Sequence, residues 1–198
     1  MQQLEMCWKV TDDLAPLELP QGYTIEPYKG EEDKTAWCEC CRDGMLIDDN
    51  GGTAEFDASM SDDIVVNYYT DVLFLKHDGE AVGTVTAFVR DDGEGELHMV
   101  GVRPDYRGRG LSKYLNNAGQ RKLIGDGVKY VFLTTDEFRK SAVKGYLSAG
   151  FLPVDCDVDM KQRWEEVLDS VNVEQTDIYN KDLQSTYTLK STGTGTVD

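Results

Sequence analysis

The chain has 198 residues, of which 40% are hydrophobic, 29% charged and 10% aromatic. This length and composition fit one soluble globular domain with its own core, and they exclude an acidic disordered chain or a collagen-like repeat. The 37 Asp and Glu residues outnumber the 20 Lys and Arg residues, and the net charge of −17 argues against nucleic-acid or anionic-membrane partners. No stretch approaches the roughly 20 apolar residues of a membrane span, and the start lacks a signal-peptide layout, so we expect a cytoplasmic protein.

Five cysteines are an odd number in a chain long enough to fold without disulfides, which indicates reduced thiols. Cys38, Cys40 and Cys41 form the one cluster with a spacing that suggests metal binding. A zinc site usually has a second pair of ligands at similar spacing, and His77 and His98 stand alone and far apart. We therefore predict cysteines on one face of a helix and no metal site.

The first elements follow from alternation and periodicity. We expect an N-terminal arm over 1–22, a short strand over 23–28, and a helix over 31–45 with acidic residues in its first turn. A second helix is predicted over 54–69, and its apolar stripe is read as core rather than as a cofactor site. The residues of that stripe are Phe56, Met60, Ile64 and Tyr68.

A three-stranded meander is predicted in the middle of the chain. The β-rich runs over 72–77 and 81–90 flank Asp78 and Gly79, and a short Asp-Gly connection is a strong hairpin signal. A further glycine-containing turn leads to a third run over 96–102.

Helices and strands alternate in the second half. The expected order is a helix over 111–124, a strand over 129–134, a helix over 140–149, a strand over 150–154 and a helix over 162–171. The domain is thus predicted over 23–170. We expect 171–198 to form a partly disordered C-terminal tail, since it is too polar to bury much surface, although Tyr179 and Tyr187 could anchor part of it.

The charge changes sign locally where the strand at 96–102 meets the next helix. Between Arg103 and Lys144 ten basic residues face four acidic ones, although the whole chain is strongly negative. The first backbone N–H groups of a helix have no intrahelical partner and carry the positive end of its dipole, so they can bind a phosphate. Gly108 and Gly110 let the backbone approach such an anion closely. The segment therefore predicts a site for a compact polyanion.

Two better-known phosphate loops do not fit. A P-loop needs Gly-x4-Gly-Lys-Ser/Thr, and the dinucleotide fingerprint needs a third glycine where Lys113 stands. The segment Arg107 to Ser112 instead resembles the Arg/Gln-x-x-Gly-x-Gly/Ala pyrophosphate loop of the GNAT superfamily of acetyl-CoA-dependent N-acetyltransferases, with Ser112 as a mild departure. The segment from Ala142 through Tyr146 to Phe151 resembles a second GNAT motif at the distance that this fold requires.

The resemblance implies an α/β (α+β) fold with a mixed central sheet of six to seven strands, splayed between strands four (96–102) and five (129–134) and flanked by helices. Acetyl-CoA would be the co-substrate, with its pantetheine arm in that gap and paired with the backbone of Val100, Gly101 and Val102. The remaining cofactor contacts implied by the loop come from Arg107, Gly108, Arg109, Gly110, Leu111 and Ser112. Arg139 stands where the family often has an Asn that contacts the arm, and it could reach the 3′-phosphate instead.

Acetyl transfer to an amine needs a free amine, a stabilised oxyanion and a proton for the departing thiolate. By resemblance, Tyr146 protonates the sulfur and the backbone N–H of Val100 or its neighbour binds the oxyanion. Glu96 matches the catalytic glutamate of histone-modifying members, while His98, on the same strand face, has a pKa nearer neutrality. We favour Glu96 as the base, with His98 and a base-free route through ordered water as alternatives.

The acceptor pocket is expected near the first two helices, where acidic residues would favour a small cationic amine. These residues are Glu31, Glu32, Asp33, Asp43, Asp48, Asp49, Glu55, Asp57, Asp62 and Asp63, which could equally be ordinary solubilising charge. One alternative function is a non-catalytic acyl-CoA sensor or partner-recognition module, and another is a lysine or N-terminal acetyltransferase acting on proteins. Family members are often dimers, and a homodimer stays open.

Overall fold

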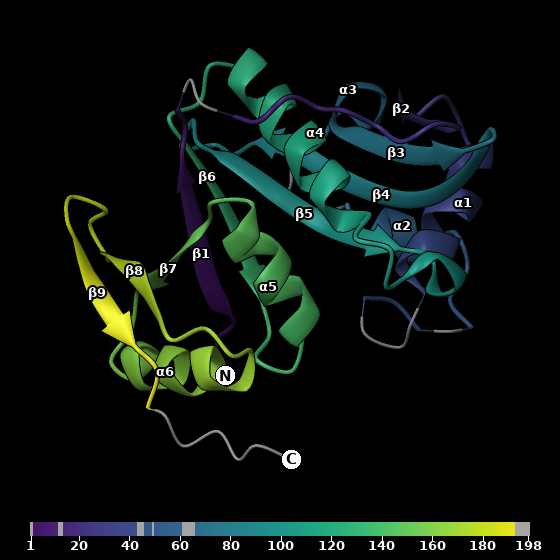
Figure 1. Ribbon diagram of the computed structural model, residues 1–198. Helices are drawn as coiled ribbons and strands as arrows, with labels where there is room; N and C mark the ends of the chain where they lie inside the picture. The colour runs from purple at the N-terminus through teal and green to yellow at the C-terminus, as the bar shows by residue number, and fades with distance from the viewer. Residues whose placement is uncertain (1, 12–13, 43–45, 49, 61–65, 193–198) are drawn as a thin grey trace. The chain divides into compact units, whose positions relative to one another are not determined.

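The computed structural model describes residues 2–11, 14–42, 46–48, 50–60 and 66–192. The chain divides into two compact units (Figure 1). The larger unit comprises Val10–Val131, and the smaller unit comprises Met1–Lys9 together with Phe132–Asp198. None of the helices in the described ranges is long and apolar enough to cross a membrane.

The larger unit contains an antiparallel sheet in the order β2 (Tyr23–Pro27), β3 (Val72–His77), β4 (Glu80–Val89) and β5 (Gly95–Val102). The predicted meander of β3, β4 and β5 is confirmed. The predicted two-residue hairpin turn between β3 and β4 is also present, and its residues Asp78 and Gly79 have φ angles of +50° and +88°. Positive φ at both central residues is what a type I′ hairpin turn requires.

Among the described residues of this unit, five helical segments accompany the sheet. They are α1 (Glu32–Cys41), α2 (Ala54–Ser59), α3 (Tyr68–Asp71), the 3-10 turn η1 (Pro104–Tyr106) and α4 (Ser112–Gly125). The single helix expected over 54–69 is wrong, since α2 ends at Ser59 and α3 begins at Tyr68. Ile64, Asp43, Asp49, Asp62 and Asp63 lie outside the described residues.

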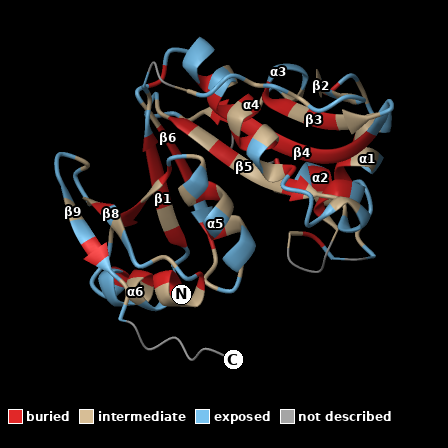
Figure 2. Cartoon of the chain, viewed as in Figure 1, coloured by how far each residue is buried: buried red, intermediate tan, exposed pale blue. Residues whose placement is uncertain are grey.

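Helices cover both faces of the sheet. A Cβ on Gly119 of α4 would lie 2.6 Å from Leu97 of β5, whereas the ring of the next residue, His98, bonds to Ser59 at the end of α2. Successive strand residues point to opposite faces, so α4 and α2 lie on opposite sides of β5. The sheet is accordingly buried between them, and β4 is buried along nearly its whole length (Figure 2).

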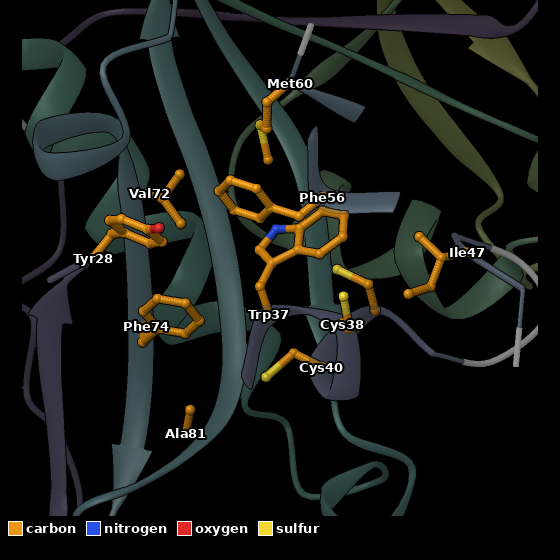
Figure 3. Packing of buried hydrophobic residues seen from close by; sticks show 11 residues of the cluster. Tyr28, Trp37, Cys38, Cys40, Ile47, Phe56, Met60, Val72, Phe74 and Ala81 are labelled. Carbon is orange, nitrogen blue, oxygen red and sulfur yellow. The ribbon is translucent and has the colours of Figure 1, made fainter. Parts of the chain in front are cut away.

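Aromatic side chains fill the core on the α1 and α2 side (Figure 3). Phe56 lies between Tyr28 and Trp37, with ring centroids 5.6 and 5.2 Å away. Cys38, Cys40 and Cys41 are all buried on α1, as expected for cysteines on a helix. Burial raises the pKa of Cys40 to about 12, so this thiol stays protonated at neutral pH.

The strands of the smaller unit follow the order β6 (Tyr130–Thr135, which enters this unit at Phe132), β1 (Leu4–Lys9), β7 (Leu152–Asp155), β8 (Gln175–Asn180) and β9 (Thr186–Lys190). The pairing is mixed, because β7 runs antiparallel to β1 and parallel to β8. Helices α5 (Lys140–Ser148) and α6 (Met160–Ser170) complete the unit. The inward side chains expected for α6, Trp164, Val167 and Leu168, are buried.

Three strands occupy segments where the sequence indicates none. Strand β1 falls within the expected arm, and Leu4 and Met6 are fully buried in it. Strands β8 and β9 fall within the expected tail, where Ile178 and Leu189 are buried and Tyr187 donates a 2.8 Å hydrogen bond to Asp155. Strand β1 pairs with β7, far later in the chain, whereas β8 pairs with β7 and β9 pairs with β8. This pairing stabilises segments whose local composition does not indicate a strand. The described residues therefore form nine strands rather than six or seven.

Candidate active site

The predicted pyrophosphate loop joins η1 to α4, and its residues 107–110 are exposed. Gly108 and Gly110 have φ angles of +74° and +69°. A Cβ on either glycine would meet no atom within 4 Å. The loop thus combines a backbone conformation that favours glycine with open space above it, which suits close approach by a ligand.

Helix α4 begins with no side-chain cap. Its N-cap residue, Leu111, makes no side-chain hydrogen bond to the helix, and the first turn carries no acidic residue. Leu111 is itself buried and fixes the point where the 14-residue helix starts. The first N–H groups of such a helix form a ready site for an anion.

The Arg107 side chain supports the loop through two backbone carbonyls. Its Nε donates to the carbonyl oxygen of Val102 at 2.9 Å, and its Nη2 donates to that of Arg42 at 3.3 Å. The guanidinium therefore connects the loop to the end of β5 and to the residue that follows α1. Arg42 gave no signal in the sequence, since a backbone carbonyl can come from any residue type.

Strand β5 contains a β-bulge just before its end. Thr86 pairs with His98 and Thr84 pairs with Gly101, so Met99 and Val100 together stand opposite Val85. Met99 has a φ of +51°, which is uncommon for a residue other than glycine. A bulge leaves its extra residue outside the regular ladder and redirects the backbone.

The bulge also changes which β5 side chains share a face. A Cβ on Gly101 would lie 2.7 Å from the carbonyl oxygen of Cys40, so Gly101 faces α1. His98 faces α2 on the same side, and Glu96 shares this face because it lies two residues earlier. Gly101 must stay small, since α1 approaches β5 so closely there.

His98 has a fixed orientation. Its Nε2 lies 2.9 Å from the carbonyl oxygen of Ser59. A carbonyl only accepts hydrogen bonds, so Nε2 carries the proton and Nδ1 is left as the acceptor in the neutral ring. Burial lowers the pKa of His98, although the hydrogen bond to Ser59 opposes that shift. The imidazole is consequently neutral near pH 7.

Glu96 is half-buried and lies near a cation. One of its carboxylate oxygens is 4.0 Å from Nη1 of Arg90, and Arg90 itself bonds to Asp92 at the turn. Glu96 thus lies beside a cation at the start of β5, two residues before His98 on the same strand.

Tyr146 and Arg139 belong to the smaller unit. Tyr146 is buried on α5, with its ring centroid 6.1 Å from that of Phe151. Burial raises the pKa of Tyr146 to about 12, and the positive charge of Arg139 opposes this shift. Arg139 precedes α5 and forms an ion pair with Asp136 at 3.1 Å, so its charge is already partly neutralised.

The larger unit thus brings together Glu96, His98, the bulged end of β5 and the loop from Arg107 to Ser112. Ser59, which orients His98, was missed by the sequence reasoning because its role comes from the backbone alone. Among the described residues, no three His, Cys, Asp or Glu side chains gather where they could hold a metal ion.

Comparison with known proteins assigns the fold. The sequence profile of the acetyltransferase (GNAT) family matches residues 37–151, which is more than half of the chain. The chain belongs to the GNAT family of acetyltransferases. The predicted family and its α/β architecture of mixed strands flanked by helices are thereby confirmed.

Curated relatives of this GNAT chain include the mycothiol acetyltransferase of Streptomyces avermitilis, 29% identical over 149 residues, covering 74% of this chain and 48% of the relative. That of Kytococcus sedentarius is 30% identical over 148 residues and covers 70% and 48%. The chain therefore spans about half the length of the curated relatives that it matches.

Solved GNAT structures show the same fold. A GCN5-related N-acetyltransferase from Sphaerobacter thermophilus aligns with a TM-score of 0.57 at 22% identity, covering 77% of this chain and 49% of that one. The ribosomal-protein-S18-alanine N-acetyltransferase of Escherichia coli aligns with a TM-score of 0.51 at 20% identity, covering 65% and 76%.

Proposed function

We propose that this GNAT chain binds acetyl-CoA and transfers its acetyl group to the amine of a small acceptor. The observation that carries the proposal is the open loop with Gly108 and Gly110 in left-handed conformations, leading into an α4 start without a side-chain cap. Those features fit a diphosphate, because backbone amides can surround it and the first turn of α4 carries no carboxylate. When bound, acetyl-CoA supplies an acetyl thioester.

The loop amides from Arg107 to Ser112 would hold the diphosphate, and Arg107 would keep the loop in shape through its bonds to Val102 and Arg42. The backbone of Val100, Gly101 and Val102 would pair with the pantetheine arm. We assign oxyanion binding to an N–H at the bulge of Met99 and Val100, where the ladder is irregular.

Tyr146 is the proposed proton donor to the departing thiolate. Its pKa, raised to about 12 by burial, keeps the hydroxyl protonated at neutral pH. A thiol, with an ordinary pKa of about 8.5, is a stronger acid than this buried phenol. The hydroxyl would therefore act by holding its proton within hydrogen-bond reach of the sulfur while the C–S bond breaks.

His98 is the proposed general base. A base must be unprotonated and oriented, and the carbonyl of Ser59 fixes the tautomer that leaves Nδ1 free to accept a proton. The lowered pKa of His98 keeps it neutral near pH 7. Glu96, which the sequence alone favoured, is near Arg90 and better suited to attract an ammonium than to deprotonate it.

The acceptor is proposed to be small and cationic. Glu32, Asp48 and Glu55 are acidic residues of the α1 and α2 region that carry no ion pair within the described ranges, whereas Glu31 and Asp57 pair with Lys34. The remaining negative charge would attract an amine. The curated relatives are named for mycothiol, and their name supports acetyl transfer to a non-protein acceptor.

The test has a binding arm and a turnover arm. We expect calorimetry to detect CoA binding, and release of free thiol from acetyl-CoA when an amine panel that includes mycothiol precursors and polyamines is added. Tyr146→Phe should slow release by about a hundredfold or more while leaving CoA binding in place. Binding without release for every amine would favour the sensor, and labelling of a lysine peptide alone would favour a protein acetyltransferase.

A further inference from the structure

The basic residues around the loop differ in whether a carboxylate neutralises them. Arg103 forms ion pairs with Glu80 and Asp105, and its charge is thereby matched. Within the described part of the chain, no carboxylate forms an ion pair with Arg109 or Lys113. Two cations without an ion pair, four residues apart in a chain with a net charge of −17, indicate a binding role for an anion.

Each cation lies over an aromatic ring, and Arg109 also bonds to the backbone. The guanidinium carbon of Arg109 lies 4.5 Å from the centroid of Tyr106, and its Nη2 donates to the carbonyl oxygen of Asp105 at 2.9 Å. Nζ of Lys113 lies 4.7 Å from the centroid of Tyr114. Both residues are exposed, so a ligand can reach them. Such contacts restrict the side chains before binding and reduce the entropy that binding must remove.

Arg109 is held over η1 rather than over the first turn of α4, since both of its contacts lie in Pro104–Tyr106. The diphosphate would occupy the amides at the start of α4 and needs no arginine there. CoA carries a second anionic group, the 3′-phosphate, which as a phosphomonoester approaches a dianion at neutral pH. Guanidinium and ammonium groups are the usual protein partners of such a phosphate.

We propose that Arg109 and Lys113 bind the 3′-phosphate of CoA, so that the protein discriminates CoA from 3′-dephospho-CoA. This inference rests on the proposed function, because it assumes that the diphosphate lies at the start of α4. It also replaces Arg139 in the role that the sequence suggested for it, since Asp136 already pairs with Arg139.

The experiment is a set of calorimetric titrations with CoA and with 3′-dephospho-CoA. The proteins are the unaltered chain, Arg109→Gln, Lys113→Gln, the double variant and the control Lys129→Gln, which removes an exposed cation of the same unit outside the loop. We expect the unaltered chain to bind CoA at least about tenfold more tightly than 3′-dephospho-CoA. The double variant should lose this preference with unchanged affinity for 3′-dephospho-CoA, and Lys129→Gln should keep it.

Two results would overturn the inference alone. One is equal affinity of the unaltered chain for the two ligands. The other is an equal loss for both ligands in the Arg109 and Lys113 variants, which would assign these cations to the diphosphate. Failure of the unaltered chain to bind either ligand would instead remove the proposed function itself. Arg109→Lys retains the charge and should restore part of the preference, which shows that a loss in Arg109→Gln is not caused by misfolding.

Discussion

The Nε2 atom of His98 lies 2.9 Å from the carbonyl oxygen of Ser59, and this bond determines which nitrogen of the ring can accept a proton. The bond joins β5 to the last residue of α2, so the orientation of the imidazole depends on how α2 packs. Ring orientation by a third group is a common feature of histidines that act as bases.

The first prediction concerns the choice of base. His98→Gln keeps a side-chain donor for the Ser59 carbonyl but cannot take a proton in catalysis. We expect kcat/KM for acetyl transfer to fall by about a hundredfold or more. The matched control is Glu96→Gln on the same strand face, for which we expect a much smaller loss. A large loss in Glu96→Gln with near-normal activity in His98→Gln would return the role to Glu96.

The second prediction concerns stability and pH. Because burial lowers the pKa of His98 in the folded chain, the unfolded chain takes up a proton first as the pH falls. The stability contributed by the neutral ring is complete above about pH 6.5 and is lost as the pH falls from there through the lowered pKa. Urea unfolding at pH 7.5 and 5.5 should show a smaller drop for His98→Gln than for the unaltered chain. Equal drops would mean that His98 does not titrate differently on folding.

The third prediction concerns the loop glycines. Gly110→Ala places a Cβ on a residue with φ of +69°, which costs about 1 kcal/mol of stability, although the space around it is open. The added methyl group would also obstruct an anion on the loop amides, and we expect CoA affinity to fall by about tenfold or more. Gly125→Ala, at the far end of α4, also meets no atom within 4 Å and serves as the control. CoA affinity in Gly125→Ala should be unchanged, and an unchanged affinity in Gly110→Ala would exclude the loop from binding.

The fourth prediction uses two adjacent asparagines of α4. Asn116 is fully buried, and neither polar atom of its side chain has a hydrogen-bond partner. Asn117 donates to the carbonyl of Ala15 and accepts from Arg121, each at 2.8 Å. Asn116→Leu should therefore raise the free energy of unfolding by about 1 kcal/mol, whereas Asn117→Leu should lower it by a similar amount. Urea unfolding measures both, and the reverse order of the two variants would contradict the prediction.

Local signals predicted the parts of the fold that local geometry determines. Asp78 and Gly79 specify their turn because few residues adopt positive φ, and the apolar stripe of Leu111 and Leu115 specifies the buried face of α4. Strand β1 was not predicted because its pairing partner lies more than a hundred residues later. Long-range pairing adds stability that no window of sequence contains.

Some residues of the candidate site could be predicted from the sequence, and others could not. The loop glycines could be identified from a motif, since the backbone conformation restricts the residue type there. The hydrogen-bond acceptors of the Arg107 and His98 side chains could not be identified from the sequence. They are the backbone carbonyls of Arg42 and Ser59, and any residue type supplies such a carbonyl. The burial of Tyr146 likewise depends on packing rather than on its neighbours in sequence.

The β-bulge of β5 limits how far a catalytic role can be assigned to a residue by aligning its position with that of a relative. Counting back from Arg107 to Glu96 passes through Met99 and Val100, which share one position on β4. A relative that lacks this insertion would carry its aligned glutamate on the α4 side of the strand, where it could serve neither as base nor as amine attractant. Deleting Met99 from this chain would likewise reverse the orientation of Glu96 and His98 relative to Gly101, so gapless alignment is valid only among proteins that share the bulge.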